Sequence, residues 1–364
     1  MKYRARLFSV KEPYTADDEL FMAAVRENFS WHRNHCGEYR KIADGLGVSE
    51  ENLTAENLPY IPTMLFKRRR LSSSKPLIRA TSSGTSGNFS VIGFEASGLL
   101  CALKMTLKIL HRRGLLSLRP CRYFIMGYKP HRSNRTAVTK TAFAATLMTP
   151  AVSRKYILKY ENGAYKPDFD GMLRELVKAS EKRLPVRFMG FPAYTYFLMK
   201  LMDERGIYVK LPKGSKIMLG GGWKQFYAEQ PDKAGFYALA EKTLGISGEN
   251  IIEFFGAVEH PVLYCDCKNH RFHVPAYSRV IIRSPDDLAP LSYGETGLCE
   301  LITPMIKATP ILAVMTDDLG VLHKGGECGC GISAPYLEII GRVAPENIKT
   351  CAAGAAEALK GMGL

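Results

Sequence analysis

The sequence lacks a long apolar run. None of its hydrophobic stretches reaches the roughly 20 residues that a helix needs to cross a bilayer. The first residues, from Met1 to Arg6, also lack the apolar block of a signal peptide. We therefore expect a cytoplasmic protein without a membrane span. The hydrophobic fraction of 46% in 364 residues suits either one large α/β domain or two smaller ones.

No nucleic-acid-binding motif is present, although the formal net charge is +15. The lysines and arginines are spread along the chain, and the one dense basic cluster, residues 67–70, is short. A cluster of this kind is usually a solvated surface. Positive charge also suits anionic cofactors or an acidic partner protein. We expect no nucleic-acid partner.

Features of a disulfide framework are missing too. The 9 cysteines are odd in number, and the chain is too large to need disulfides for stability. Four of them lie in apolar or mixed surroundings, which predicts small core residues. These four are Cys36, Cys101, Cys121 and Cys299.

The remaining clustered cysteines predict a metal site. Cys267 and His273 flank one short loop, and Cys328 and Cys330 form a second pair. Two such pairs on separate loops suit a closed Cys₃His site, in which thiolates favour structural Zn²⁺. Cys265 and His270 are alternative ligands. The competing interpretation is a set of reduced cysteines in turns.

The usual phosphate loop, GxxxxGK[ST] opening a helix, is absent. In its place a stretch rich in hydroxyls and glycine precedes an apolar run at residues 89–94. Glycines allow a close backbone approach, so this loop can turn N–H groups and hydroxyls toward an anion. A flexible surface turn is the alternative. The loop comprises Thr81, Ser82, Ser83, Gly84, Thr85, Ser86 and Gly87.

The rest of the chain predicts a mainly parallel α/β body followed by a β-rich part. Apolar periodicity predicts helices over residues 15–44, 95–113, 136–148, 172–183, 193–205 and 232–244. Strands are expected over residues 89–94, 121–128, 186–191, 216–219 and 250–255, and such alternation indicates a parallel sheet. Short strands follow at 271–274, 278–283, 298–303, 311–316 and 336–340. We divide the chain into an α/β body (1–263), a β-rich subdomain (264–343) and a helical tail (344–364).

Two glycine motifs follow expected strands, where ligands gather in parallel sheets. The first is Gly220, Gly221 and Gly222 followed by Trp223 and Lys224, which would let a flat ligand lie against backbone beside a cation. The second runs Phe255, Gly256, Ala257, Val258 and Glu259, an aromatic ring and a carboxylate suited to a base and to Mg²⁺. The first motif can also be read as a simple strand-ending turn.

Two further motifs complete the series. Thr316, Asp317 and Asp318 are predicted to form a polar turn after a strand, where a carboxylate could bind ribose hydroxyls. Arg342 ends the last expected strand and is able to hold phosphate.

Taken in order, these motifs resemble those of the adenylate-forming ligases, the superfamily of acyl-CoA synthetases, luciferases and adenylation domains. The resemblance covers residues 59–342 and implies that the hydroxyl loop binds ATP phosphates. It also implies that Gly220–Gly222 and Phe255 bind adenine, that Asp318 binds ribose, and that Glu259 binds Mg²⁺. The family's small C-terminal domain, which carries its adenylation lysine, is expected to be absent because the sequence ends soon after Arg342.

Val258 departs from the family's threonine at this position. With the glycine turn and residues 273–283, this departure is similar to the acyl-protein synthetases of bacterial luminescence and to relatives of phenylacetate-CoA ligase. The resemblance implies formation of an acyl-adenylate from a fatty or aromatic acid, and transfer of the acyl group to a thiol. Lys224 is our hypothesis for the compensating charge, and Cys351 for the acyl acceptor.

Alternatives to this interpretation remain open. A truncated acyl-CoA or aryl-CoA ligase would use coenzyme A, while an acyl-protein synthetase would pass the group to a reductase or a carrier-protein partner. A non-catalytic nucleotide-binding protein is the rival from another class.

Overall fold

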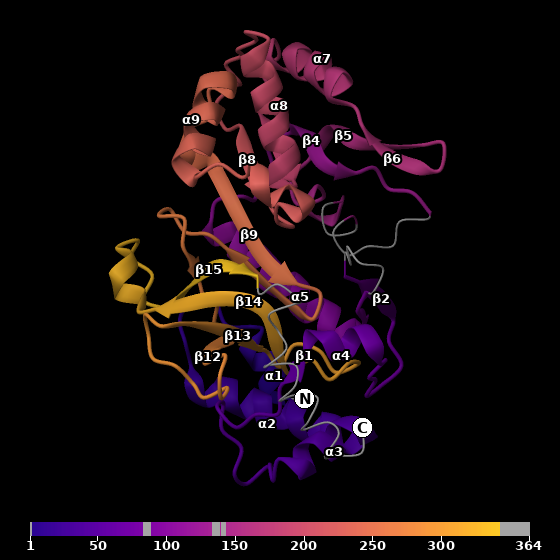
Figure 1. The fold of residues 1–364 in the computed structure, drawn as a ribbon, viewed down its shortest axis with the longest axis vertical. Helices are drawn as coiled ribbons and strands as arrows, with labels where there is room; N and C mark the ends of the chain where they lie inside the picture. Colours follow the sequence, from indigo (N-terminus) through magenta and orange to yellow (C-terminus); the bar gives the residue numbers. More distant parts are fainter. Residues whose placement is uncertain (1, 83–88, 133–138, 140–142, 343–364) are drawn as a thin grey trace. The chain divides into compact units, whose positions relative to one another are not determined.

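The chain forms two compact units, Met1–Arg112 with Gly256–Leu364 (the first unit) and Arg113–Phe255 (the second unit). The computed structural model describes residues 2–82, 89–132, 139 and 143–342 (Figure 1). Of the predicted helix at 136–148, residues 136–138 and 140–142 lie outside these residues, and 143–145 are helical. No described helix combines the length and apolar character that crossing a membrane requires.

The second unit contains the predicted parallel sheet. Strands β9, β8, β7, β4 and β5 are neighbours in that order and run parallel, and β6 pairs antiparallel at the end. The strands are β4 (Cys121–Tyr128), β5 (Ala151–Glu161), β6 (Ala164–Pro167), β7 (Val186–Gly190), β8 (Lys216–Leu219) and β9 (Ile251–Ala257). The helices are α7 (Phe169–Ser180), α8 (Pro192–Glu204) and α9 (Lys233–Leu244), with short 3₁₀ turns η1 (Lys224–Glu229) and η2 (Gly248–Asn250).

The core of this unit lies between the sheet and its helices. Strands β4 and β7 are mostly buried and largely apolar, as expected for strands covered on both faces. Phe124, Phe188 and Leu198 are fully or almost fully buried in this core. Gly190 has φ of +133°, and a Cβ there would come within 2.5 Å of the Met126 carbonyl oxygen. Only glycine therefore fits where β7 leaves the sheet beside β4.

The first unit contains an antiparallel sheet in the order β11-β15-β14-β13-β12, with β1 parallel to β14. Its strands are β1 (Ile61–Pro62), β11 (Phe272–His273), β12 (Arg279–Arg283), β13 (Thr296–Ile302), β14 (Ala313–His323) and β15 (Tyr336–Arg342). A separate hairpin joins β2 (Ile78–Thr81) to β3 (Val91–Phe94), and β10 (His260–Cys265) contacts α5. The helices are α1 (Lys2–Leu7), α2 (Asp18–His35), α3 (Gly37–Gly45), α4 (Thr63–Arg68) and α5 (Ala96–Arg112), and η3 (Gly325–Cys328) is a 3₁₀ turn.

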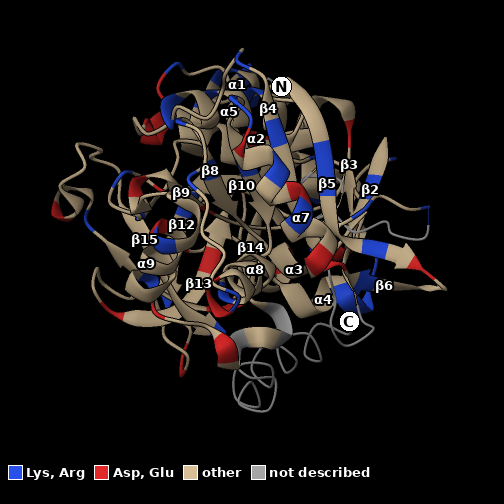
Figure 2. Cartoon of the chain, turned by 90° about the horizontal axis from the view of Figure 1, so that it is seen from above, with Lys and Arg blue, Asp and Glu red and all other residues tan. Residues whose placement is uncertain are grey.

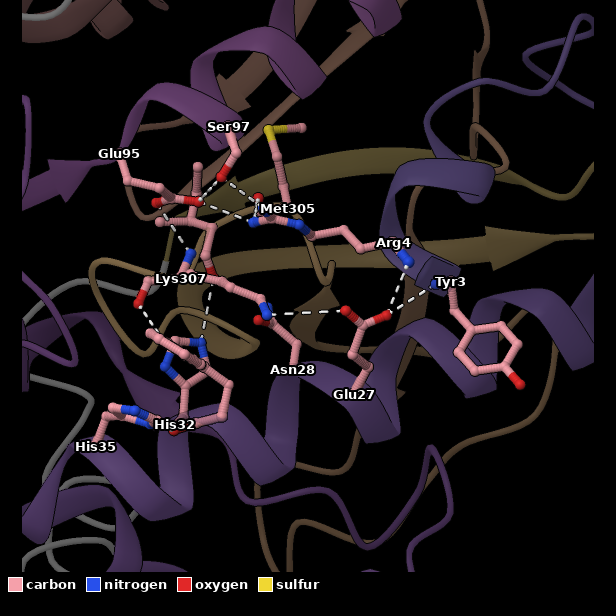
Figure 3. Close-up of polar contacts among 12 residues, drawn as sticks. Tyr3, Arg4, Glu27, Asn28, His32, His35, Glu95, Ser97, Met305 and Lys307 are labelled. Atoms are coloured by element: carbon pink, nitrogen blue, oxygen red, sulfur yellow. Dashed lines mark hydrogen bonds and ion pairs between the residues drawn. The ribbon is translucent and has the colours of Figure 1, made fainter. Parts of the chain in front are cut away.

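A buried polar network joins α1, α2 and the start of α5 to the segment before β14 (Figure 3). Arg4 bonds the Glu95 carboxylate at 2.8 Å and the Met305 carbonyl oxygen at 3.0 Å. The same carboxylate accepts the backbone N–H groups of Lys307 and Ala308. These hydrogen bonds thus offset the free-energy cost of burying the charges of Arg4 and Glu95.

Most predicted elements are confirmed, including the exact bounds of β4 and β8. The single predicted helix over 15–44 is wrong, since Cys36 is extended (φ −131°) and separates α2 from α3. The predicted polar turn at Asp317 and Asp318 is also wrong, because β14 continues to His323. Strands β5 and β6 and helix α4 were not predicted. The four cysteines expected in the core are buried.

Basic and acidic residues are interspersed along many elements (Figure 2). In the second unit Lys155 lies 2.7 Å from Glu175, and Lys159 pairs with Asp168. Many of the cations behind the positive net charge therefore have a carboxylate neighbour.

Candidate functional site

The hydroxyl-rich loop is carried by the β2–β3 hairpin. Thr81 pairs with Val91 at the end of the hairpin that is next to the loop. Ser82 follows this pair and is hydrogen-bonded to Ser90. The Ser82 N–H donates to the Ser90 carbonyl oxygen at 3.1 Å, and the Ser82 hydroxyl accepts the Ser90 N–H at 2.9 Å. The base of the loop is thus fixed by two hydrogen bonds. Residues 83–87, the rest of the predicted phosphate loop, lie outside the described residues.

The glycine turn follows β8 in the second unit. Gly221 has φ of +84°, and a Cβ on it would meet the Phe191 ring at 2.9 Å. The turn therefore requires glycine both for its conformation and for its packing. Trp223 is buried and contacts Tyr196 with ring centroids 5.7 Å apart, so it belongs to the core. Lys224 begins the η1 turn directly after it.

The motif that starts at Phe255 spans the end of β9 and the turn into β10. A Cβ at Gly256 would lie 3.1 Å from the Val262 carbonyl oxygen, so the two strands approach closely at this point. Ala257 ends β9, and Val258 and Glu259 form the turn. Glu259 is only 5% exposed, which places a carboxylate with little solvent around it.

Two predicted site residues come together in the first unit. Asp318 lies opposite Arg342 in the β14–β15 register, and Arg342 Nε donates to Asp318 Oδ1 at 2.8 Å. The Asp318 side chain is 8% exposed, whereas that of Arg342 is 67% exposed. Arg342 thus holds the buried carboxylate while most of its own side chain remains accessible to a ligand.

Sequence reasoning missed the partners of Asp317. Thr63 Oγ1 donates to its Oδ1 at 3.3 Å, and Lys67 Nζ lies 3.8 Å from Oδ2. Both residues come from α4, which follows Pro62. The proline before a polar residue was the available signal for this helix start, and it was read as part of a loop. Lys67 is therefore one member of the basic cluster with a defined carboxylate partner.

The four predicted metal ligands also come together. Ligand atoms of Cys267, His273, Cys328 and Cys330 all lie within 4.8 Å of one another. The Sγ atoms of Cys267 and Cys328 are 3.5 Å apart, and Cys330 Sγ is 3.1 Å from His273 Nε2. No such group includes Cys265 or His270 among the described residues. His270 instead contacts the Asp266 carboxylate at 2.9 Å.

Hydrogen bonds around this cluster prepare it for a cation. His273 Nδ1 donates to the Ala334 carbonyl oxygen at 2.6 Å, which leaves Nε2 as the electron-pair donor. Burial alone would raise the pKa of the Cys267 thiol, but the neighbouring His273 side chain and hydrogen bonds from the backbone N–H groups of Arg271 and Asn269 lower it to about 6. A thiolate is the form that binds metal.

Of the remaining predicted site residues, Cys351 lies outside the part of the chain that the structure describes. The others divide between the units: Gly220–Gly222, Lys224 and Phe255 belong to the second, and Thr81, Glu259, Asp318 and Arg342 to the first.

Comparison with known proteins identifies the family. Residues 6–360 match the family model described as acyl-protein synthetase, LuxE. The chain is 26% identical over 356 residues to the long-chain-fatty-acid–luciferin-component ligase of Aliivibrio fischeri, covering 92% of this chain and 88% of that protein. It is 25% identical to the ligase of the same name from Vibrio harveyi, over 93% of this chain and 88% of that protein.

Among solved structures, the chain is similar to an open conformation of 2-hydroxyisobutyryl-CoA ligase in complex with 2-HIB-AMP and CoA. The TM-score is 0.66 at 13% identity, and the alignment covers 93% of this chain and 79% of that one. At this identity the likeness establishes the fold alone, and it confirms the predicted α/β fold of the adenylate-forming ligases. Because the family model covers nearly the whole sequence, the chain belongs to the acyl-protein synthetase family, LuxE.

Proposed function

We propose that this protein uses ATP to activate a carboxylic acid as an acyl-adenylate and then transfers the acyl group to a thiol. The observation that carries the proposal is the family match over residues 6–360, because it spans every motif that the sequence shares with adenylate-forming ligases. The two relatives are named as ligases of long-chain fatty acids, which supports the same reaction class.

In the first step a carboxylate oxygen of the acid attacks the α-phosphorus of ATP. A new P–O bond forms, the bond to the β-phosphate oxygen breaks, and pyrophosphate leaves with that electron pair. The thiol sulfur then attacks the acyl carbon, forming a thioester and releasing AMP, while the thiol proton is lost. The main obstacle in the first step is repulsion between two anions, which positively polarised groups offset.

Residues of the first unit would meet the phosphates and the ribose. The hydroxyls of Thr81 and Ser82 stand at the base of the loop proposed to bind the phosphates. Asp318 would accept hydrogen bonds from ribose hydroxyls, and the exposed guanidinium of Arg342 would bind phosphate oxygen. Glu259 would bind Mg²⁺, since carboxylate oxygen is a ligand that this ion prefers. When bound, Mg²⁺ supplies positive charge at the phosphate oxygens.

Residues of the second unit would meet the base. The backbone of Gly220–Gly222 and the ring of Phe255 are proposed to lie against adenine. Lys224 is proposed to supply a positive charge to the reaction. Replacing Lys224 with alanine should lower adenylate formation at least tenfold without a change in melting temperature, and near-normal turnover would exclude this role.

The thiol and imidazole cluster is proposed to hold structural Zn²⁺. Zinc binds sulfur at about 2.3 Å in a tetrahedron, so neighbouring ligand sulfurs lie roughly 3.8 Å apart. The 3.5 Å separation of Cys267 and Cys328 fits this arrangement. Four protein ligands close the coordination shell, which indicates a structural rather than a catalytic ion. Bound zinc would tie β11 to the η3 turn that precedes β15.

The acyl acceptor is proposed to be Cys351, with coenzyme A or the thiol of a carrier-protein partner as the alternatives. Incubation with ATP, Mg²⁺ and acid, followed by mass spectrometry, distinguishes them. A thioester on Cys351 that is absent from the Cys351→Ser variant supports the first acceptor. Acyl-CoA formation in the presence of coenzyme A, without a protein thioester, supports the ligase alternative.

The primary test is acid-dependent pyrophosphate release by the purified full-length chain. A panel should contain tetradecanoate, octanoate, benzoate, 4-hydroxybenzoate and phenylacetate. Release above the acid-free rate with at least one acid, together with acyl-AMP detected by mass spectrometry, is the expected result. Nucleotide binding without pyrophosphate release for every acid would instead favour the non-catalytic alternative.

A further inference from the structure

The two halves of the thiol and imidazole cluster differ in how far the protein covers them. Cys267 and His273 are 5% and 0% exposed, whereas Cys328 and Cys330 are only half-buried. The half-buried pair comes from the end of the η3 turn and the residues directly after it. Solvent therefore reaches the four ligand atoms most readily on the side of Cys328 and Cys330.

The loop that carries Cys328 and Cys330 is rich in glycine. Glycine occupies four of the seven positions 325–331. Gly329 and Gly331 have φ of +69° and +92°, in the left-handed region that favours this residue. Because glycine has the greatest backbone freedom, such a loop loses much conformational entropy when it closes over an ion. A contact that fixes the loop beforehand would therefore strengthen metal binding.

Asn269 makes such a contact from the other ligand loop. Its side-chain amide donates to the Cys328 carbonyl oxygen at 2.6 Å, and its backbone N–H donates to Cys267 Sγ at 3.3 Å. One residue thus joins a ligand of each loop, Cys267 through its sulfur and Cys328 through its backbone.

The turn that carries Asn269 is itself fixed. The His270 N–H donates to the Cys267 carbonyl oxygen at 3.0 Å, and His270 Nδ1 lies 2.9 Å from Asp266 Oδ2. Asp266 is 1% exposed, so this contact fastens the turn to the interior of the first unit. Although Asn269 is exposed, its position is therefore determined by its neighbours on both sides.

We propose that Asn269 is a positioning residue of the zinc site, which holds the half-buried ligand Cys328 over the ion and thereby slows the release of zinc. It is not one of the four ligands, and it acts through the backbone of one of them. Residues that support metal ligands in this way typically change metal affinity by about 10- to 100-fold when they are replaced. The inference rests on the proposed function, because it concerns the Zn²⁺ assigned there to the four ligands.

The test measures zinc release from the purified full-length chain to an excess of the coloured chelator pyridylazoresorcinol. Asn269→Ala removes the bond to Cys328 and retains the backbone N–H that bonds Cys267, so its zinc release should be at least about tenfold faster than that of wild type. Asn269→Gln retains an amide donor and should recover part of the slow release. Lys268→Ala, an exposed neighbour in the same turn, should leave the rate unchanged.

A second measurement separates metal binding from general stability. The metal-free forms of wild type and Asn269→Ala should unfold at similar urea concentrations. Zinc should raise the unfolding midpoint less in the variant, because weaker binding stabilises the folded state less. Equal release rates in wild type and Asn269→Ala overturn the inference, and so does an equal loss of stability in the metal-free and zinc-loaded forms. Wild-type protein that neither contains nor takes up zinc contradicts the proposed zinc site itself.

Discussion

Arg342 Nε donates a hydrogen bond to Asp318 Oδ1 at 2.8 Å across the β14–β15 pair. The two residues are far apart in sequence, and each was predicted separately to bind part of ATP. In this pair the Arg342 guanidinium and the Asp318 carboxylate hold each other in position without a bound ligand. The buried carboxylate has a cationic partner, and the guanidinium that holds it belongs to a side chain that is 67% exposed.

Replacement of Asp318 by asparagine should weaken ATP binding. Each lost hydrogen bond to an ionised carboxylate is worth about 1.5–3 kcal/mol, so the KM for ATP should rise roughly 10- to 100-fold. Asp317→Asn is the matched control, because that carboxylate is directed to Thr63 and Lys67. The KM for ATP in pyrophosphate release measures both variants. An equal rise in the two would show that Asp318 has no special role.

Replacement of Arg342 by alanine should strongly lower the rate of adenylate formation and change the free energy of unfolding only slightly. Its side chain is 67% exposed, and an ion pair of this kind contributes at most about 1 kcal/mol to the free energy of unfolding. Loss of a phosphate-binding donor, by contrast, should slow adenylate formation by about 100-fold. Urea unfolding and single-turnover acyl-AMP formation measure the two quantities. A large loss of stability with unchanged chemistry would reverse this assignment.

Zinc content should depend on the four clustered ligands. The wild-type chain should carry one Zn²⁺, measured by mass spectrometry of the metal, and Cys330→Ser should lose most of it. Chelation should lower the melting temperature of the wild-type protein and have little effect on this variant, since bound metal stabilises only the folded state. Cys265→Ser is the control, because Cys265 lies outside the cluster. Full zinc in Cys330→Ser would contradict the proposed ligand set.

Local pattern was sufficient to predict elements whose features lie within one stretch of sequence. The apolar run of β4 and the periodicity of α5 needed no knowledge of their neighbours, and both were found. Failures occurred where tertiary contacts decide. Asp318 looks like a turn residue by composition, but its pairing with Arg342 on β15 keeps β14 extended through it. Strand propensity depends strongly on such neighbours.

The metal ligands illustrate the same limit within the candidate site. Their residue types and spacing predicted the four members, yet Cys265 and His270 remained possible alternatives from sequence alone. Only folding resolved them, because the turn after β10 directs His270 toward Asp266. The hydrogen bond from Asn269 to Cys328 was not predicted at all, since it joins two separate loops.

Stability should fall in acid because of a buried neutral histidine. His260 is fully buried, and burial lowers its pKa from 6.5 to about 3. Its contribution to stability is therefore present above pH 6.5 and is lost as the pH falls toward 3, since only the unfolded chain takes up the proton. The slope should be about 1.4 kcal/mol per pH unit. Urea unfolding between pH 7.5 and 5 should show a smaller slope in His260→Phe than in wild type. Equal slopes would contradict this source of acid sensitivity.

The buried network around Arg4 should be a main determinant of stability in the first unit (Figure 3). The Arg4 and Glu95 side chains are 3% and 16% exposed. Although burial alone would raise the pKa of Glu95, hydrogen bonds from Arg4 and from the Lys307 N–H hold it below its usual value. Removing one partner of such a pair leaves a charge buried without compensation.

Arg4→Ala should therefore lower the free energy of unfolding by about 3 kcal/mol. Arg6→Ala, on the exposed side of α1, should change it by less than about 0.5 kcal/mol. Adding Glu95→Gln to Arg4→Ala should recover part of the loss, because the uncompensated negative charge is then absent. Urea unfolding of the three variants measures these differences. Equal losses from Arg4→Ala and Arg6→Ala would show that the ion pair contributes nothing beyond an exposed arginine, and an unchanged loss in the double variant would show that burial of the Glu95 charge is not the cause.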